Sequence, residues 1–219
     1  MPLDNVLLLM RKISISKEEI SQLETVHLNG PIYVVNSLTE AKQAIAYLRK
    51  QECVGFDTET RPSFKKGQQR AMALMQLSTL DECFLFRVNK IGIPDFLREF
   101  LEDDYVLKIG LSIKDDFRIL SRSDKAGTTP HGFVELQTMV KEYGISDISL
   151  QKVYAILFDK RISKSQRLSN WEAPELTDAQ QQYAAIDAWA CLKIYHHLKD
   201  GNFNAEKCKY IKEVEDIIL

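Results

Sequence analysis

Short apolar runs alternate with amphipathic stretches along most of the chain from Pro31 onward. Runs of this length are typical of β-strands, and apolar positions spaced three and four residues apart are typical of helices. The pattern predicts strands at 32–35, 53–59, 71–78, 83–88 and 105–111, with 132–139 as a last strand or extended segment. It predicts helices between them at 36–49, 93–101 and 112–121.

The C-terminal third of the chain is expected to be mainly helical, with its longest helix beginning near Leu176. The whole pattern therefore predicts an α/β fold in which a mixed five-stranded sheet is flanked by helices. We interpret residues 1–30 as an N-terminal arm, 31–199 as one folded domain and 200–219 as a short C-terminal extension. A length of 219 residues fits one large domain with a substantial core.

The composition narrows the possible functions. The net charge of −2 gives no overall basic field, which argues against a passive nucleic-acid binder. The four cysteines form no CxxC pair, so the spacing of a zinc site is absent, and reduced thiols indicate a cytoplasmic protein. The N-terminal run VLLLM is too short for a signal peptide or a membrane span.

Two acids stand at the end of an apolar strand, in the sequence VGFDTET. Because side chains two residues apart share one face of a strand, Asp57 and Glu59 project together and Thr58 projects the other way. One interpretation is a frayed strand end that faces water. The other is a cavity or an ion that neutralises both carboxylates, for which a divalent metal is the usual partner.

A third acid belongs to the sequence GLSIKDDFRIL. If residues 112–121 form a helix, Ile113, Phe117 and Leu120 lie on its packed side. Asp116 then lies at the rim of that side, whereas Asp115 faces solvent on the opposite side. We therefore select Asp116 as the third candidate metal ligand.

Tyr183 and Asp187 stand four residues apart in QQYAAIDAW, so they share one face of the predicted long helix. Ala190 and Ile194 continue that face, which indicates that it packs inward. A buried tyrosine hydroxyl with a hydrogen-bond partner would explain the pair equally well. Each of these signals is weak alone, and together they favour a metal site.

Basic and aromatic residues near the acids are candidate contacts for a phosphate backbone or a base. The alternative for each is a solvated loop residue, or, for Trp171, a core residue. One group follows the first acidic motif and comprises Arg61, Phe64, Lys65, Lys66 and Arg70. A second precedes the long helix and comprises the basic residues Lys160, Arg161, Lys164 and Arg167, followed by Trp171; of these, Lys164, Arg167 and Trp171 are the selected candidates.

These motifs together resemble those of the DEDD-type 3′–5′ exonucleases of the tyrosine subclass, a branch of the ribonuclease H-like fold. FDTETRPSFKKGQQRAMALMQLS resembles the first motif and its following strand, and KIGLSIKDDFRIL resembles the second. KSQRLSNWEAPELTDAQQQYAAIDAWACLKIY resembles the third. The second motif lacks the asparagine of many polymerase-associated relatives, which places the chain with the Werner-syndrome exonuclease and ribonuclease D branch.

The resemblance implies a nuclease that releases nucleoside monophosphates from the 3′ end of DNA or RNA. It implies that Asp57, Glu59, Asp116 and Asp187 hold two Mg²⁺ or Mn²⁺ ions roughly 3.5–4 Å apart. It also implies that Tyr183 orients the attacking water. Two alternatives stay open: a catalytically silent nucleic-acid-binding or scaffold module on the same fold, and a ribonuclease D-like enzyme that trims RNA 3′ ends.

Overall fold

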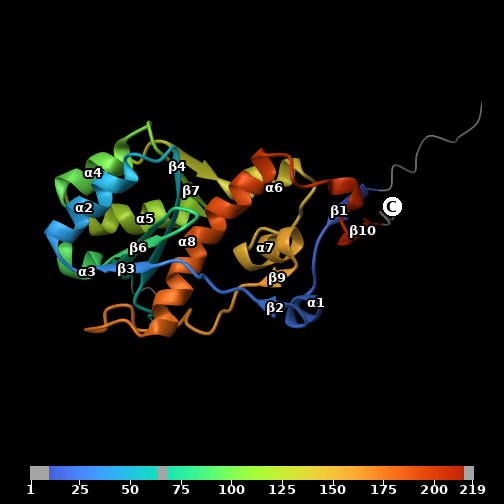
Figure 1. Cartoon of the computed structure of the whole chain (residues 1–219), viewed down its shortest axis with the longest axis horizontal. Coiled ribbons are helices and arrows are strands. Elements are labelled where there is room, and N and C mark those ends of the chain that lie inside the picture. The colour runs from blue at the N-terminus through green and yellow to red at the C-terminus, as the bar shows by residue number, and fades with distance from the viewer. Residues whose placement is uncertain (1–9, 64–68, 215–219) are drawn as a thin grey trace, which may run out of the picture.

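A mixed sheet of six strands forms the centre of this computed structural model, which describes residues 10–63 and 69–214. The strands lie in the order β3-β6-β5-β4-β7-β8 (Figure 1). Their bounds are β3 (Ile32–Val35), β4 (Cys53–Thr60), β5 (Met72–Ser78), β6 (Cys83–Phe86), β7 (Leu107–Gly110) and β8 (Phe133–Glu135). β5 runs antiparallel to both of its neighbours, and the other pairs are parallel.

The predicted α/β fold with a mixed sheet is confirmed, and one detail differs. The sheet has six strands rather than the expected five, because Phe133–Glu135 pairs with β7 residue by residue. The central strand β5 is buried along all seven of its residues, since helices cover both of its faces. This explains why its sequence is a nearly continuous apolar run.

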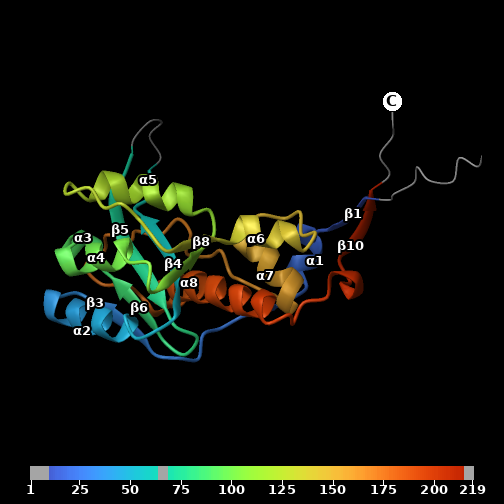
Figure 2. The ribbon, with the colours of Figure 1, turned by 90° about the horizontal axis from the view of Figure 1, so that it is seen from above.

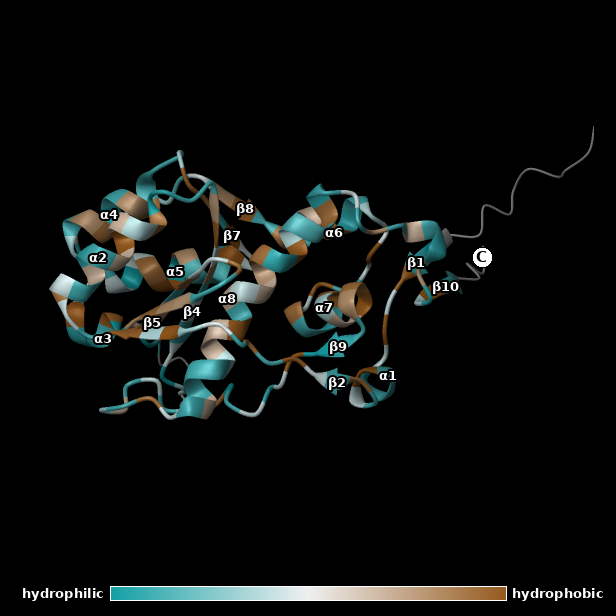
Figure 3. Cartoon of the chain, in the orientation of Figure 1, coloured by the Kyte–Doolittle hydropathy of each residue, from teal (hydrophilic) through white to brown (hydrophobic). Residues whose placement is uncertain are grey.

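Helices lie on both sides of the sheet, and each side has its own apolar core. One core is formed with α2 (Leu38–Leu48), α3 (Val88–Ile91), α4 (Asp95–Glu102) and α5 (Ile113–Ser123). The larger core is formed with α6 (Leu136–Glu142), α7 (Leu150–Phe158) and α8 (Asp178–Lys199). Figure 2 shows α5 and α8 on opposite sides of β4. In Figure 3 the strands of the six-stranded sheet are largely brown, whereas β9 and the first turns of α8 are teal.

The N-terminal segment, expected as an arm, is part of the larger core. It contains β1 (Met10–Ile13), α1 (Lys17–Ser21) and β2 (Glu24–Thr25). Its buried side chains are Ile13, Ile15, Ile20, Val26 and Leu28. β1 pairs antiparallel with β10 (Ile211–Val214), and β2 pairs parallel with β9 (Lys160–Arg161).

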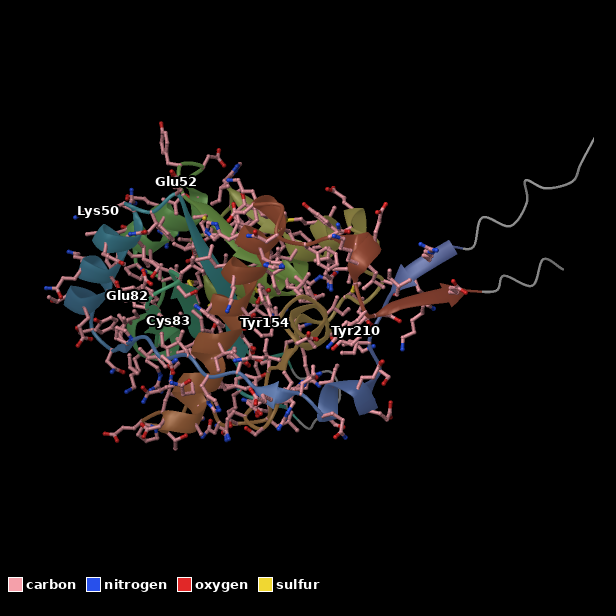
Figure 4. The ribbon with its side chains drawn as sticks, turned by 45° about the vertical axis from the view of Figure 1, so that its right-hand side comes forward. Lys50, Glu52, Glu82, Cys83, Tyr154 and Tyr210 are labelled. Atoms are coloured by element: carbon pink, nitrogen blue, oxygen red, sulfur yellow. The ribbon has the colours of Figure 1, made fainter. Side chains whose placement is uncertain are left out.

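The segment after α8 returns towards the N-terminal strand. It contains a short 3₁₀ turn, η1 (Ala205–Lys207), before β10. Tyr210, labelled in Figure 4, donates a hydrogen bond from its hydroxyl to Asp159 Oδ1 (2.7 Å). Tyr154, labelled in the same figure, lies on α7 and contacts the ring of Trp189 on α8. Among the described residues, no helix has the length and apolar character needed to cross a membrane.

Candidate metal centre

The acids of the first motif lie on the face of β4 that meets α8. Gly55 stands two residues before Asp57 on that face, and its backbone touches the helix: a Cβ atom on Gly55 would lie 1.9 Å from the carbonyl oxygen of Ala188. A residue without a side chain is therefore required at this contact. The consequence is a close approach of α8 to β4, which places an acid of the helix beside the acids of the strand.

Asp187 and Tyr183 lie one turn apart on α8. The start of this helix is fixed by a reciprocal cap, in which Thr177 Oγ1 accepts a hydrogen bond from the Gln180 N–H and Gln180 Oε1 accepts one from the Thr177 N–H. Among the described residues, ligand oxygens of Asp57, Glu59 and Asp187 lie within 4.8 Å of one another. Three carboxylates at this separation form a group that is able to hold a divalent cation.

Asp116 lies beside this group but on the other face of β4. The Thr58 hydroxyl, which the strand directs away from Asp57 and Glu59, donates a hydrogen bond of 2.5 Å to Asp116 Oδ1. Asp116 is 7% exposed, whereas the Asp115 side chain is 73% exposed and forms an ion pair with Arg118. The position of each acid around the helix thus correctly predicted that Asp116 is buried and Asp115 is exposed to solvent.

The first turn of α5, which carries Asp116, is anchored to the neighbouring strand. The Glu135 carboxylate accepts hydrogen bonds from the N–H groups of Ser112 (3.0 Å) and Ile113 (2.9 Å). Ser112 has a φ of 65°, in the left-handed region that side chains other than glycine adopt at a cost. A strained residue held by two hydrogen bonds sets the angle at which α5 leaves β7, and with it the position of Asp116.

Burial raises the pKa of all four candidate metal ligands, and repulsion from the neighbouring site acids adds to it for Asp57 and Glu59. Burial is the larger cause for Asp57, whose pKa is raised well above its ordinary value, and the neighbouring acids add to it. The pKa of Glu59 is raised to about 8, and those of Asp116 and Asp187 to about 7. Four carboxylates cannot all carry their charge here at neutral pH unless a cation offsets it.

A cavity of about 420 Å³ opens onto the acids. Its walls include Asp57, Glu59, Tyr183 and Asp187, together with two of the predicted basic residues, Lys164 and Arg167. The charge of Arg167 acts to lower the pKa of Glu59, and that of Lys164 acts to lower the pKa of Asp187. The site therefore combines an acidic floor with a basic rim, an arrangement suited to a metal-bound phosphate.

The other described residues that were predicted to contact nucleic acid do not line the acidic cavity. Arg61 forms an ion pair with Glu172 (3.3 Å), and Arg70 is half-buried. Trp171 is fully buried, and its ring packs on Tyr183 at a centroid distance of 5.9 Å. Of its two interpretations, the structure favours the core residue. Phe64, Lys65 and Lys66 lie outside the described residues.

Sequence reasoning missed two residues that organise the site. Strand alternation correctly directs Thr58 away from Asp57 and Glu59, but its hydrogen bond to Asp116 depends on where α5 packs. Gly55 stands within an apolar run, and an isolated glycine in a strand is a known signal of close backbone approach. That signal was present in the sequence, but the identity of the approaching helix was not.

Comparison with known proteins agrees with this geometry. A family model described as a 3′–5′ exonuclease matches residues 32–201. The chain is 33% identical over 175 residues to the Mus musculus bifunctional 3′–5′ exonuclease/ATP-dependent helicase WRN, covering 77% of the chain and 12% of that protein. The chain spans between 12% and 52% of the length of the first curated relatives it matches.

Solved structures share the fold at lower sequence identity. Escherichia coli RNase D superimposes with a TM-score of 0.69 at 19% identity, covering 77% of this chain and 44% of that one. Trypanosoma brucei RNase D, in a complex with the RNA U12, superimposes with a TM-score of 0.68 at 21% identity, covering 78% and 63% of the two chains. The expected ribonuclease H-like fold and the expected resemblance to the Werner and ribonuclease D branch are both confirmed.

Proposed function

The chain belongs to the 3′–5′ exonuclease family, and from this premise we propose that it hydrolyses phosphodiester bonds one at a time from the 3′ end of a nucleic acid. One observation carries the proposal. The three carboxylates of Asp57, Glu59 and Asp187 converge within 4.8 Å at the floor of a cavity with a basic rim. A module that only binds nucleic acid has no need of converging acids, which repel phosphate.

The acids fit divalent cations. They offer hard oxygen donors, and no histidine stands among the described residues that line the cavity, which favours Mg²⁺ or Mn²⁺ over softer metals. We propose that Asp57, Glu59 and Asp187, with Asp116 from the other face of β4, would hold two such ions. When bound, the ions would offset the negative charge of the phosphodiester and favour deprotonation of the attacking water.

Tyr183 would orient the attacking water rather than deprotonate it. Burial, and then the charge of Asp187, raise the pKa of its hydroxyl further above the ordinary value of about 10. The hydroxyl therefore keeps its proton at neutral pH and acts as a hydrogen-bonding group. The buried Trp171 ring packed on Tyr183 would keep the hydroxyl in place.

Lys164 and Arg167 would bind the phosphates of the polymer at the rim of the cavity. Their charges offset part of the repulsion between the acids and the phosphates, and each phosphate they neutralise makes binding weaker at higher salt. The polymer is DNA or RNA: one relative's name joins an exonuclease to a helicase, and one structural neighbour holds RNA. All four cysteines are unpaired, which supports a cytoplasmic location.

The test is a panel of 5′-labelled substrates with Mg²⁺, Mn²⁺ or a chelator. The panel contains single-stranded DNA, a recessed duplex and single-stranded RNA. We expect a stepwise ladder from the 3′ end that a chelator abolishes, and the substrate that gives it identifies the polymer. Internal cuts, or cleavage in the chelator, would contradict the proposal.

Two matched variants tie the activity to the site. Asp57→Asn removes one charge from the acidic group and should abolish the ladder. Asp115→Asn removes one charge from the neighbouring surface of α5 and should leave the ladder unchanged, because its carboxylate is solvated and lies outside the cavity. A parent protein that binds the substrates without cutting any of them would instead support the catalytically silent module.

A further inference from the structure

The N-terminal residues 23–28, here called the bracing segment, lie between two parts of the candidate site. On one side is the basic loop, residues 162–168, which carries Lys164 and Arg167. On the other side is the first part of α8, which carries Tyr183 (Figure 1). The bracing segment precedes residues 32–201, the part of the chain that the exonuclease family model matches. Its contacts therefore lie outside the part of the chain that this model matches.

Backbone pairing ties the bracing segment to the strand that leads into the basic loop. β2 pairs with β9, and beyond it the Val26 N–H donates a hydrogen bond to the carbonyl oxygen of Arg161 (2.9 Å). Arg161 Nε in turn donates one to the carbonyl oxygen of Leu23 (2.9 Å). Since Arg161 directly precedes the basic loop, these bonds fix the point from which the loop departs.

A side-chain amide ties the same segment to α8. Gln182 Nε2 donates a hydrogen bond to the carbonyl oxygen of Leu28 (3.1 Å), and Gln182 Oε1 accepts one from the Leu28 N–H (3.3 Å). Gln182 directly precedes Tyr183. Leu28 and Val26 are both buried, so the segment is seated on the protein along its length. The bracing segment thus links α8, which carries Tyr183 and Asp187, to the basic loop, which carries Lys164 and Arg167.

A second cavity, of about 320 Å³, lies where these three parts meet. It shares Ile162, Ser163 and Tyr183 with the acidic cavity, so one short stretch of the basic loop separates the two spaces. That stretch is held at its start, because Ile162 is buried in the larger core. One end is held by the bracing segment through β9, and Gln151 on α7 donates a hydrogen bond to the carbonyl oxygen of Ile162 (2.8 Å).

We propose that the bracing segment positions the basic loop, and that it thereby sets the affinity of the protein for the phosphates of its substrate. The inference rests on the proposed function, in which those phosphates enter the acidic cavity. A loop held in its binding position loses less conformational freedom when the polymer binds than a free loop does. Gln182, Arg161 and Leu28 are on this account positioning residues, since they act through Lys164 and Arg167.

The variant Gln182→Met tests the link without a change of charge, because methionine has a similar length and helix propensity but cannot form the two bonds to Leu28. Gln181→Met is the matched control. It changes the same residue type at the next position of α8, and it removes a bond to the carbonyl oxygen of Leu176 instead. Binding of a 5′-fluorescein oligonucleotide with Ca²⁺ in place of Mg²⁺, and KM and kcat with Mg²⁺, are measured for both.

We expect Gln182→Met, which removes two hydrogen bonds, to raise Kd and KM about fivefold, a change equal to the net free energy of about one of them, with kcat unchanged. The slope of log Kd against log salt should fall by about 0.7 for each phosphate of a single strand that the basic loop ceases to neutralise. In a Lys164→Ala, Arg167→Ala background, Gln182→Met should add nothing. A fivefold effect that persists in that background, an unchanged salt slope, or an equal effect of Gln181→Met would overturn the proposal.

Arg161→Lys keeps the charge but gives up the guanidinium bond to Leu23, and it replaces Gln182→Met if that variant does not fold. If thermal melts show that neither variant folds, the segment has a general structural role and the proposal is overturned. The two proposals fail separately. A parent protein that binds but gives no ladder refutes the proposed function, whereas one that gives a ladder while Gln182→Met binds like the parent refutes only the positioning role.

Discussion

Replacing Gly55 by alanine should separate α8 from β4 and so disperse the candidate metal ligands. The added Cβ would lie 1.9 Å from the carbonyl oxygen of Ala188, and ordinary contact begins at 3.4 Å, so strand and helix must part by about 1.5 Å. Neither partner yields easily, because the obstructing atom belongs to the backbone of a buried helix. Overpacking of this kind costs about 1–3 kcal/mol.

The displacement bears directly on the metal site. Asp57 is two residues after Gly55, and Asp187 directly precedes Ala188, so the parted backbones carry the two acids. We expect the affinity for Mn²⁺, measured by isothermal titration calorimetry, to fall by at least about tenfold, as it does when the groups that orient metal ligands are removed. The melting temperature should fall by about 4–8 °C for a cost of about 2 kcal/mol in a chain of this size.

The control is Gly127→Ala. Gly127 has a φ of +84°, and no atom of the described residues lies within 4 Å of the position of its Cβ atom, so alanine there is strained without touching another described element. Its cost of about 1–3 kcal/mol should lower the melting temperature and leave Mn²⁺ affinity unchanged. A Gly55→Ala protein that melts and binds Mn²⁺ like the parent would refute the steric argument for how α8 is seated.

Three further outcomes follow from the site. Thr58→Val removes the hydrogen bond to Asp116 at nearly constant shape, and we expect Mn²⁺ affinity to fall about tenfold; unchanged calorimetric affinity would contradict this. Without metal, the folded protein keeps protons on Glu59 (pKa about 8) and Asp187 (pKa about 7) that the unfolded chain has lost. Its melting temperature should therefore fall as the pH rises from 5 to 8. A melting temperature that rises over this range would contradict the raised pKa values. Asp187→Asn removes a charge that repels Asp57 and Glu59, so at pH 8 the metal-free variant should melt at a higher temperature than the metal-free parent. Added Mg²⁺ should raise the melting temperature of the variant by less than that of the parent. A metal-free variant that melts at a lower temperature than the parent would show that the acids do not repel one another in the parent.

The parts of this structure that follow from local periodicity could be predicted from the sequence. A period of two placed Asp57 and Glu59 on one face of β4, and helical phase separated Asp116 from Asp115. The close approach at Gly55, the partner of Thr58 and the packing of Trp171 on Tyr183 could not, because each depends on elements that meet only in the folded chain. The packing of residues 10–30 could not be predicted for the same reason: β2 is two residues long and takes its place from β9, far away in the sequence.

Because β1 pairs with β10, the first and last strands of the described structure lie next to each other. Met10 is the register partner of Val214, so the backbone enters and leaves the described structure side by side (Figure 1). A short linker can therefore join the two ends, and the break can be moved to another surface loop without disturbing the sheet. The same geometry would let the domain be inserted into a loop of an unrelated host protein, since the host has only a narrow gap to close around it.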